Sequence, residues 1–181
     1  MRHLVFALSF TMWLNVTGTG HAEENKSDRD KMASSVKKLK GSMSYHQKRP
    51  GRPVSIVRLG NKPATDEMLA PLEGLPHVTV LELQGTKVPD AGLASLKALV
   101  ELLHLNLSNT AVGDAGLAHL KGLSTLNVLI LEKTAVTDAG LKNLEGLSQL
   151  KILNLKKTKV TDGAAKNLRK KLKTTLIFTG S

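Results

Sequence analysis

The chain contains no cysteine, and only five of its 181 residues are Phe, Tyr or Trp. Without thiols it forms neither disulfides nor thiolate zinc sites, so packing must provide its stability. Phe6, Phe10 and Trp13 lie close to the N-terminus, which leaves Tyr45 and Phe178 for the rest of the chain. Because bound sugars and single-stranded nucleic acids usually stack on aromatic side chains, this scarcity argues against both classes of ligand and against specific nucleic-acid recognition.

The first residues have the pattern of an export signal. Residues 1–3 are a short basic start, residues 4–16 are apolar, and residues 20–22 form a small-residue cleavage site. The apolar run, about 13 residues, is shorter than the roughly 18 expected of a membrane-spanning helix. We predict a signal peptide over residues 1–22, cleaved after Ala22, and an exported protein, periplasmic or secreted, with no transmembrane segment after cleavage. An uncleaved membrane anchor is the alternative.

The formal charge of +11 is unevenly distributed along the chain. Residues 54–150 carry seven basic and ten acidic residues, whereas residues 151–181 carry nine basic residues and one acidic residue. Such a cationic end attracts anionic partners in a salt-dependent way, and it predicts an anionic polymer as one class of partner. The alternative, which we favour, is a soluble, self-repelling cap on an open edge. The candidate anion-binding residues are Lys156, Lys157, Lys159, Arg169, Lys170, Lys171 and Lys173.

A stretch of 24 residues repeats in register along the chain. Residues 99–122 and 123–146 match closely, and residues 75–98 and 147–170 fit the same frame. Apolar residues recur at repeat positions 1, 4, 7, 9, 14, 19 and 22. The 7/9 spacing indicates a strand and the 19/22 spacing indicates one or two helical turns, so the sequence predicts a solenoid in which each repeat packs only against its neighbours.

The motif LxxLxxLxLxxTxVTDAGLxxLxG, read in residues 123–146, resembles the leucine-rich repeat family. Within that family it is similar to the short "TDAGL" variety of exported bacterial proteins, which is akin to the cysteine-containing repeats of F-box proteins. The resemblance covers four repeats, residues 75–170. It implies an α/β leucine-rich repeat solenoid, with a short curved parallel β-sheet on the concave side and short helices on the convex side.

Fainter elements flank these repeats. Residues 51–74 form a degenerate repeat, with Lys62-Pro63-Ala64 in place of the usual Thr-x-Val step. Residues 174–178 add a last strand, so we assign residues 171–181 to a C-terminal cap strand. Residues 42–45 add a first strand, within an N-terminal linker and cap over residues 23–50.

Residues 28–40 have the apolar spacing of an amphipathic helix. Ser27 or Asp28 is its predicted N-cap, and Gly41 its stop. A solenoid exposes core at its ends, so this helix is expected to cover the first repeat. Residues 23–27 are expected to be disordered.

Two polar residue types, Asp and Thr, recur at fixed positions of the repeat, whereas the histidines do not. An Asp at position 16 would cap backbone N–H groups as each short helix opens, and a cation ladder is the alternative. A Thr at position 12 is expected, from the family resemblance, to satisfy backbone groups of adjacent turns. Histidines have no metal-ligand spacing, so we predict no metal site. The Asp residues are Asp66, Asp90, Asp114, Asp138 and Asp162, and the Thr residues are Thr86, Thr110, Thr134 and Thr158.

Positions 6 and 8 alternate with the buried leucines, so they face the concave side, where leucine-rich repeats commonly bind partners. An apolar stripe flanked by polar residues is typical of a protein interface. The alternative is that β-branched residues simply suit strands. Position 6 holds Ile56, Val80, His104, Val128 and Ile152, and position 8 holds Arg58, Glu82, Asn106, Ile130 and Asn154.

The sequence therefore predicts an exported, non-catalytic module that docks a protein or peptide on its concave face. No nucleophile, base and orienting group can be placed together, so no enzyme is predicted, and no cofactor is needed. Binding of an anionic polymer such as envelope glycan, acidic lipid or nucleic acid through the basic C-terminal end is the second hypothesis. A substrate-receptor role like that of F-box proteins is weaker, because residues 23–52 are short and highly charged.

Overall fold

The computed structural model describes residues 25–49, 51 and 53–180. Its framework is one seven-stranded sheet in which the strands follow their order along the chain. The first pair is antiparallel and all later pairs are parallel. The predicted signal peptide and its cleavage site lie outside the described residues. The strands are β1 (Ser42–Tyr45), β2 (Val54–Arg58), β3 (Val80–Glu82), β4 (His104–Asn106), β5 (Val128–Ile130), β6 (Ile152–Asn154) and β7 (Leu176–Phe178).

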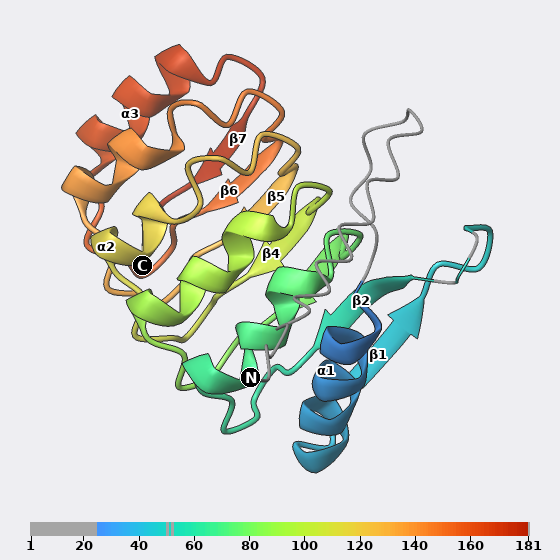
Figure 1. Cartoon of the computed structure of the whole chain (residues 1–181). Helices are drawn as coiled ribbons and strands as arrows, with labels where there is room; N and C mark the ends of the chain where they lie inside the picture. Colours follow the sequence, from blue (N-terminus) through green and yellow to red (C-terminus); the bar gives the residue numbers. More distant parts are fainter. Residues whose placement is uncertain (1–24, 50, 52, 181) are drawn as a thin grey trace, which may run out of the picture.

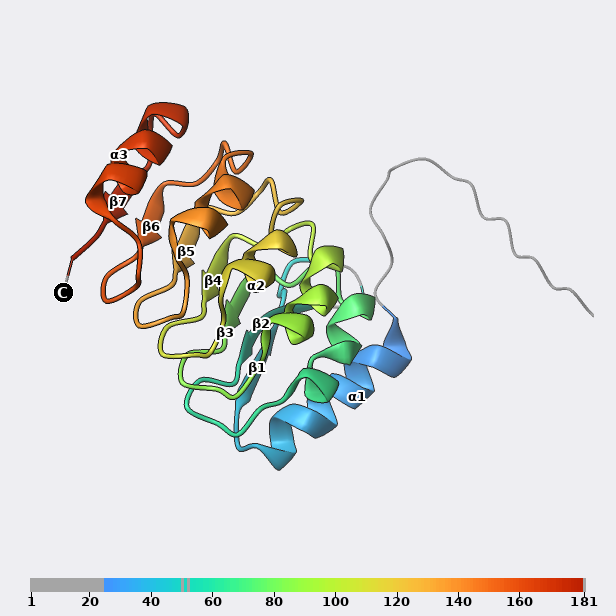
Figure 2. The same cartoon turned by 90° about the vertical axis from the view of Figure 1, so that its left-hand side faces the viewer.

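Short helical turns connect successive parallel strands and stack along one side of the sheet (Figures 1 and 2). Five of the six segments open at the Asp of position 16, and the apolar residues of positions 19 and 22 are buried over the core. The fold is thus the predicted α/β solenoid, with one strand and one helical segment in each complete repeat and two short helical segments in the degenerate repeat. The segments are η1 (Asp66–Met68), η2 (Ala70–Gly74), η3 (Asp90–Ala98), α2 (Asp114–Ala118), η4 (Asp138–Leu144) and α3 (Asp162–Lys171).

The core is a set of leucine columns that run the length of the solenoid. Strand residues 24 positions apart pair directly, as Leu105 does with Leu81 on one side and Leu129 on the other. Leu129 and Leu131 have no exposed surface, and the other predicted core positions of the same repeat are also buried. Fully burying one leucine contributes about 1.5–3 kcal/mol, so this repeated burial holds the coils together.

The N-terminal helix α1 (Lys26–Lys38) covers the first coil, with Met32 and Val36 buried. Its N-cap is Asn25, whose side chain accepts a 2.9 Å hydrogen bond from the Ser27 N–H. The predicted cap at Ser27 or Asp28 is therefore wrong. Disorder over residues 25–27 is wrong too, because Asn25 also donates its N–H to the Gly74 carbonyl at 2.9 Å.

The end of α1 depends on two consecutive residues. Lys40 adopts a left-handed conformation, with φ of 53°, and the Gly41 N–H returns to the Val36 carbonyl at 2.9 Å. Gly41 itself has no positive φ; its role is close approach, since a Cβ there would lie 2.6 Å from the Arg58 carbonyl oxygen. The predicted glycine stop thus corresponds to a lysine in the left-handed position.

The other end of the solenoid is formed by α3 and β7, far from α1 (Figures 1 and 2). The Thr161 hydroxyl accepts a 3.2 Å hydrogen bond from the Ala164 N–H and caps α3. Leu168, Leu172 and Ile177 are buried beneath this last helix and strand. One edge of β7 has no neighbouring strand among the described residues.

Candidate protein-binding face

The ten residues predicted at positions 6 and 8 lie in two parallel rows on the face of the sheet opposite the leucine core. Register places each row member directly beside its counterpart in the next strand, so Val128 pairs with Ile152 and Ile130 with Asn154. Their neighbours at position 7 are buried, whereas nine of the ten are half-buried and Ile152 is 37% exposed. The strands thus bring the predicted residues together on one surface.

Two residues that the sequence analysis did not select extend these rows. Leu176 pairs with Ile152, and Phe178 pairs with Asn154. Their side chains are 63% and 44% exposed, more than any of the ten predicted residues. The 24-residue spacing could have identified them, because each lies 24 residues after a member of the rows. Both fall beyond the last complete repeat.

The two halves of this face differ in chemistry. In the N-terminal half, polar side chains satisfy one another: Arg58 Nε donates to Glu82 Oε1 at 3.3 Å, and Asn106 Oδ1 accepts from the Ser108 hydroxyl at 2.7 Å. In the C-terminal half, Ile130 and Phe178 replace such polar residues in the same row. The face therefore presents paired polar groups at one end and apolar side chains at the other.

The seven predicted anion-binding residues do not converge on one site. Three follow β6, three lie on the last turns of α3, and Lys173 lies in the turn before β7. Arg169 donates a 3.0 Å hydrogen bond to the Ile177 carbonyl, and Lys171 pairs with Glu145 at 2.6 Å. The Arg169 bond covers a backbone carbonyl of β7, the last strand of the sheet, which is a structural use of its charge.

The Asp column binds the next repeat rather than its own helix. Asp114 Oδ1 accepts a 2.9 Å hydrogen bond from the Thr137 N–H, and its Oδ2 accepts a 2.6 Å bond from the Thr137 hydroxyl. Asp138 binds Thr161 in the same manner at 2.7 and 2.9 Å. The carboxylates do begin the short helices, as expected, but the N–H groups that they cap belong to the following coil.

Glycine at position 18 makes room for this bridge. A Cβ on Gly140 would meet the Oδ1 atom of Asp114 and would lie 3.0 Å from its Cγ atom. The bridge from Asp66, in the degenerate repeat, is missing. The residue in the place of the donor is Pro89, which has no N–H. The "DAG" motif is thus a device for fastening neighbouring coils.

The threonines of position 12 do not make the expected hydrogen bonds to adjacent turns. The Thr86, Thr110 and Thr134 side chains are buried, and each hydroxyl donates to the carbonyl three residues earlier in its own repeat at 2.7 Å. Thr158 makes the same bond at 2.6 Å. The prediction of bonds to adjacent turns is wrong, because the chain reverses after each strand and brings its own carbonyl within reach.

A charged cluster at the beginning of β3 and β4 escaped the sequence analysis. Arg49 Nη1 donates to Glu101 Oε2 at 2.8 Å, and His77 Nδ1 lies 3.0 Å from Glu101 Oε1. Burial alone would raise the pKa of Glu101, but hydrogen bonds and charges from Arg49 and His77 outweigh it and hold that pKa below its usual range. The cluster ties the β1–β2 connection to the repeats over residues 75–98 and 99–122.

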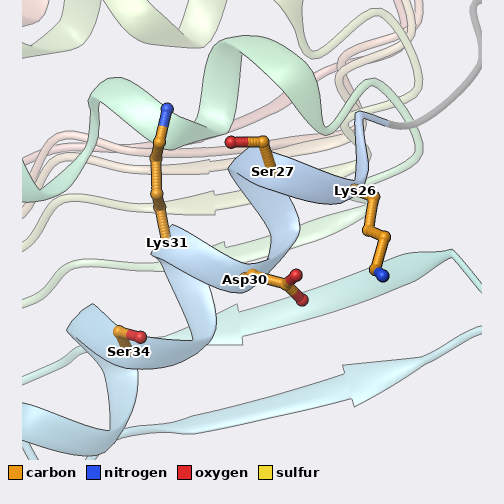
Figure 3. A pocket seen from close by; sticks show the side chains of 5 residues that line it. All are labelled: Lys26, Ser27, Asp30, Lys31 and Ser34. Carbon is orange, nitrogen blue, oxygen red and sulfur yellow. The ribbon is translucent and has the colours of Figure 1, made fainter.

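The pockets among the described residues are open to solvent and enclose little space for a small molecule. Figure 3 shows one of about 520 Å³, lined by five side chains that all come from α1. Among the described residues, no group of three or more His, Asp or Glu side chains is placed to hold a metal ion. None of the helices in that same part of the chain combines the length and apolar character that crossing a bilayer requires.

A family model described as "Leucine Rich repeat" matches residues 102–120. The ectodomain of the receptor kinase SOBIR1 from Arabidopsis thaliana aligns over 89% of this chain and 95% of its own, at 13% identity and a TM-score of 0.59. PEPR1, in a structure with AtPEP1, aligns over 72% of this chain at 14% identity and a TM-score of 0.50. A leucine-rich repeat protein of Leptospira interrogans is 24% identical over 60% of this chain, with a TM-score of 0.47.

The chain spans 27% of the Leptospira chain and 18% of the PEPR1 chain. No curated protein sequence matches it. The architecture is that of a leucine-rich repeat solenoid, and the motif match together with the structural likeness supports the leucine-rich repeat family. The finer resemblance to the "TDAGL" variety and to F-box proteins remains a prediction.

Proposed function

We propose that this protein is a non-catalytic binding module that docks a protein or peptide on the face formed by positions 6 and 8. The observation that carries this proposal is the pair of continuous rows, whose C-terminal strands expose apolar side chains beside the polar side chains of the N-terminal strands. A soluble protein leaves such an apolar strip uncovered at a cost unless a partner covers it. Seven strands about 4.8 Å apart offer room for an interface of roughly 800 Å² per partner.

The proposal includes export, since residues 1–22 have the pattern of a signal peptide. It does not include a role as an F-box-like substrate receptor. The only helix that precedes the repeats in the described part of the chain is α1, and its apolar residues Met32 and Val36 are buried as a cap. They are therefore not available to bind an adaptor.

A second candidate is attraction of an anionic polymer to the basic C-terminal end. It is favoured by Lys156 and Lys159, which are exposed and make no ion pair with any described residue. Such binding would weaken steeply as salt is added. A retention assay on an immobilised sulfated polysaccharide, run from low to high salt, tests it.

The main proposal is tested with the double variant Val128→Asp/Ile130→Asp. The full chain is immobilised and used to capture partners from the extracellular or periplasmic fraction of its host. Two buried carboxylates at the centre of an interface should abolish capture, because charge is depleted from interface cores and costly to desolvate there.

The matched control is Val100→Asp/Ala139→Asp, which adds the same charge at exposed positions outside the two rows. It should retain capture. Circular dichroism verifies that both variants keep the wild-type fold. Equal capture by the Val128/Ile130 variant and wild type would refute docking on this face.

A further inference from the structure

The last three strands form an apolar patch, which we define as Val128, Ile130, Ile152, Leu176 and Phe178. Parallel register joins these side chains across β5, β6 and β7. Exposure increases toward the end of the solenoid, from half-buried on β5 to 37% for Ile152 and 63% for Leu176. The patch is therefore the most accessible apolar part of the face.

Four exposed lysines flank the patch at both ends of its strands. Lys151 directly precedes β6 and Lys173 precedes β7, whereas Lys156 and Lys157 follow β6. Only Lys157 has an acidic neighbour, since its Nζ lies 3.8 Å from Glu132 Oε1. The other three make no ion pair with any described residue, so the rim of the patch carries excess positive charge.

This charge decides which occupant suits the patch. A second copy of the chain would bring the same lysines against the first, and like charges across an interface cost several kcal/mol. A single-stranded nucleic acid would find one aromatic platform, Phe178, where such proteins use several. A partner with acidic and apolar side chains satisfies both the rim and the centre.

We propose that the apolar patch and its four flanking lysines bind an extended acidic segment of a protein partner. The segment carries apolar side chains at alternate positions in its middle and Asp or Glu at both ends. Lys151 precedes β6, whereas Lys156 and Lys157 lie in the turn that follows it, so a peptide that lies along this strand can meet a lysine at each end. This inference rests on the proposed function, because it specifies the partner chemistry at one end of the same face.

Asn154 lies between Ile130 and Phe178 in the same row and can hold the peptide backbone. Its Oδ1 accepts a 3.0 Å hydrogen bond from the Lys156 N–H, whereas its Nδ2 makes only a 3.5 Å contact with Glu132. The amide N–H₂ is therefore available to a peptide carbonyl. The N-terminal half of the face offers no comparable attraction, because Arg58 and Glu82 already neutralise each other.

The test begins with a displayed library of random 12-residue peptides selected on the full chain. We expect the enriched pool to contain at least three times more Asp and Glu than Lys and Arg. One enriched peptide is then synthesised together with a twin in which every acidic residue is replaced by Lys. Fluorescence anisotropy should show that the twin binds at least tenfold more weakly.

Two variants assign binding to the patch and to its rim. Leu176→Asp/Phe178→Asp should weaken binding of the acidic peptide at least tenfold. Lys156→Glu/Lys173→Glu should do the same and should bind the Lys twin more tightly than the acidic peptide. The matched control Lys26→Glu/Lys31→Glu makes the same charge change on α1, at the opposite end of the solenoid, and should stay within about twofold of wild type.

Absence of enrichment, or an enriched pool with no acidic excess, overturns this inference. So does peptide binding that survives both the Leu176/Phe178 and the Lys156/Lys173 variants. Binding lost with the lysine variant but unchanged in the apolar variant identifies general attraction of polyanions and also overturns it. Partner capture that depends on Val128 and Ile130 but ignores both variants would leave the proposed function standing without this one, so the two failures are distinguishable.

Discussion

Replacing Gly140 with Ala tests whether the glycine of each repeat exists to admit a carboxylate from the preceding coil. The new methyl group would meet Asp114 Oδ1 and would lie 3.1 Å from Leu117 Cδ1. Asp114 must then move, and its two hydrogen bonds to Thr137 are lost. We expect a loss of stability even though alanine is intrinsically the better helix former.

The magnitude follows from these opposing effects. Hydrogen bonds to a charged group contribute about 1.5–3 kcal/mol each, but Thr137 is only half-buried, so water replaces part of the loss and about 1 kcal/mol remains for each. Replacing glycine with alanine in a helix returns roughly 0.5–1 kcal/mol. The net loss in the free energy of unfolding is about 1–1.5 kcal/mol, which corresponds to roughly 2–6 °C in Tm for a chain of this size.

The assay is urea unfolding followed by far-ultraviolet circular dichroism. Gly146→Ala is the matched control in the same repeat, because a Cβ there would meet nothing within 4 Å. It should be neutral or slightly stabilising. In a double-mutant cycle, Gly140→Ala should cost little in an Asp114→Ala background, so the coupling between the two positions should exceed 1 kcal/mol. Equal stabilities for Gly140→Ala and Gly146→Ala, or no coupling to Asp114, would refute the reasoning.

Two further predictions concern the turn after β5 and the Glu101 cluster. Lys133 has φ of 55°, a left-handed conformation that asparagine adopts more readily than lysine. Lys133→Asn should therefore raise the free energy of unfolding by about 0.5–1 kcal/mol, whereas Lys142→Asn within η4 should not. Equal stabilities of the two variants in thermal unfolding would contradict this prediction. Because the folded-state pKa of Glu101 is lowered, its stabilisation is present at neutral pH and is lost as the pH falls below the ordinary value near 4.5. Glu101→Gln should therefore be less stable than wild type at pH 7 and approach it at pH 3 in urea titrations, and a constant difference would show that the ionised carboxylate is not responsible.

Much of the fold follows from periodicity. The leucines of positions 4, 7 and 9 recur every 24 residues, and this pattern suffices to predict one strand and one helical segment per coil. The two rows of the candidate face follow from the same argument, because residues that alternate with buried leucines must lie on the opposite face of the strand. Such inferences succeed because they involve residues close together in one repeat.

Contacts between repeats were harder to predict. The sequence pattern places Asp114 at the start of a helix, where capping of its own turn is the ordinary expectation. The structure shows that its partner, Thr137, lies 23 residues later, in the next repeat. The opposite error concerns Thr134, which was expected to bond an adjacent turn but donates to the carbonyl of Leu131 in its own repeat. The Arg49, His77 and Glu101 cluster joins three segments with no shared sequence pattern.

The sequence by itself determined the repeating coil, the identity of its buried columns and the excess of positive charge at its C-terminal end. Only the tertiary structure decided how successive coils are fastened and where the face is most open. The physical reason is that periodicity describes which way a side chain points within one turn, whereas hydrogen bonds and exposure depend on what lies in the next turn. Leu176 and Phe178 belong to the face because β7 pairs in register with β6, and they remain exposed because no described strand follows β7.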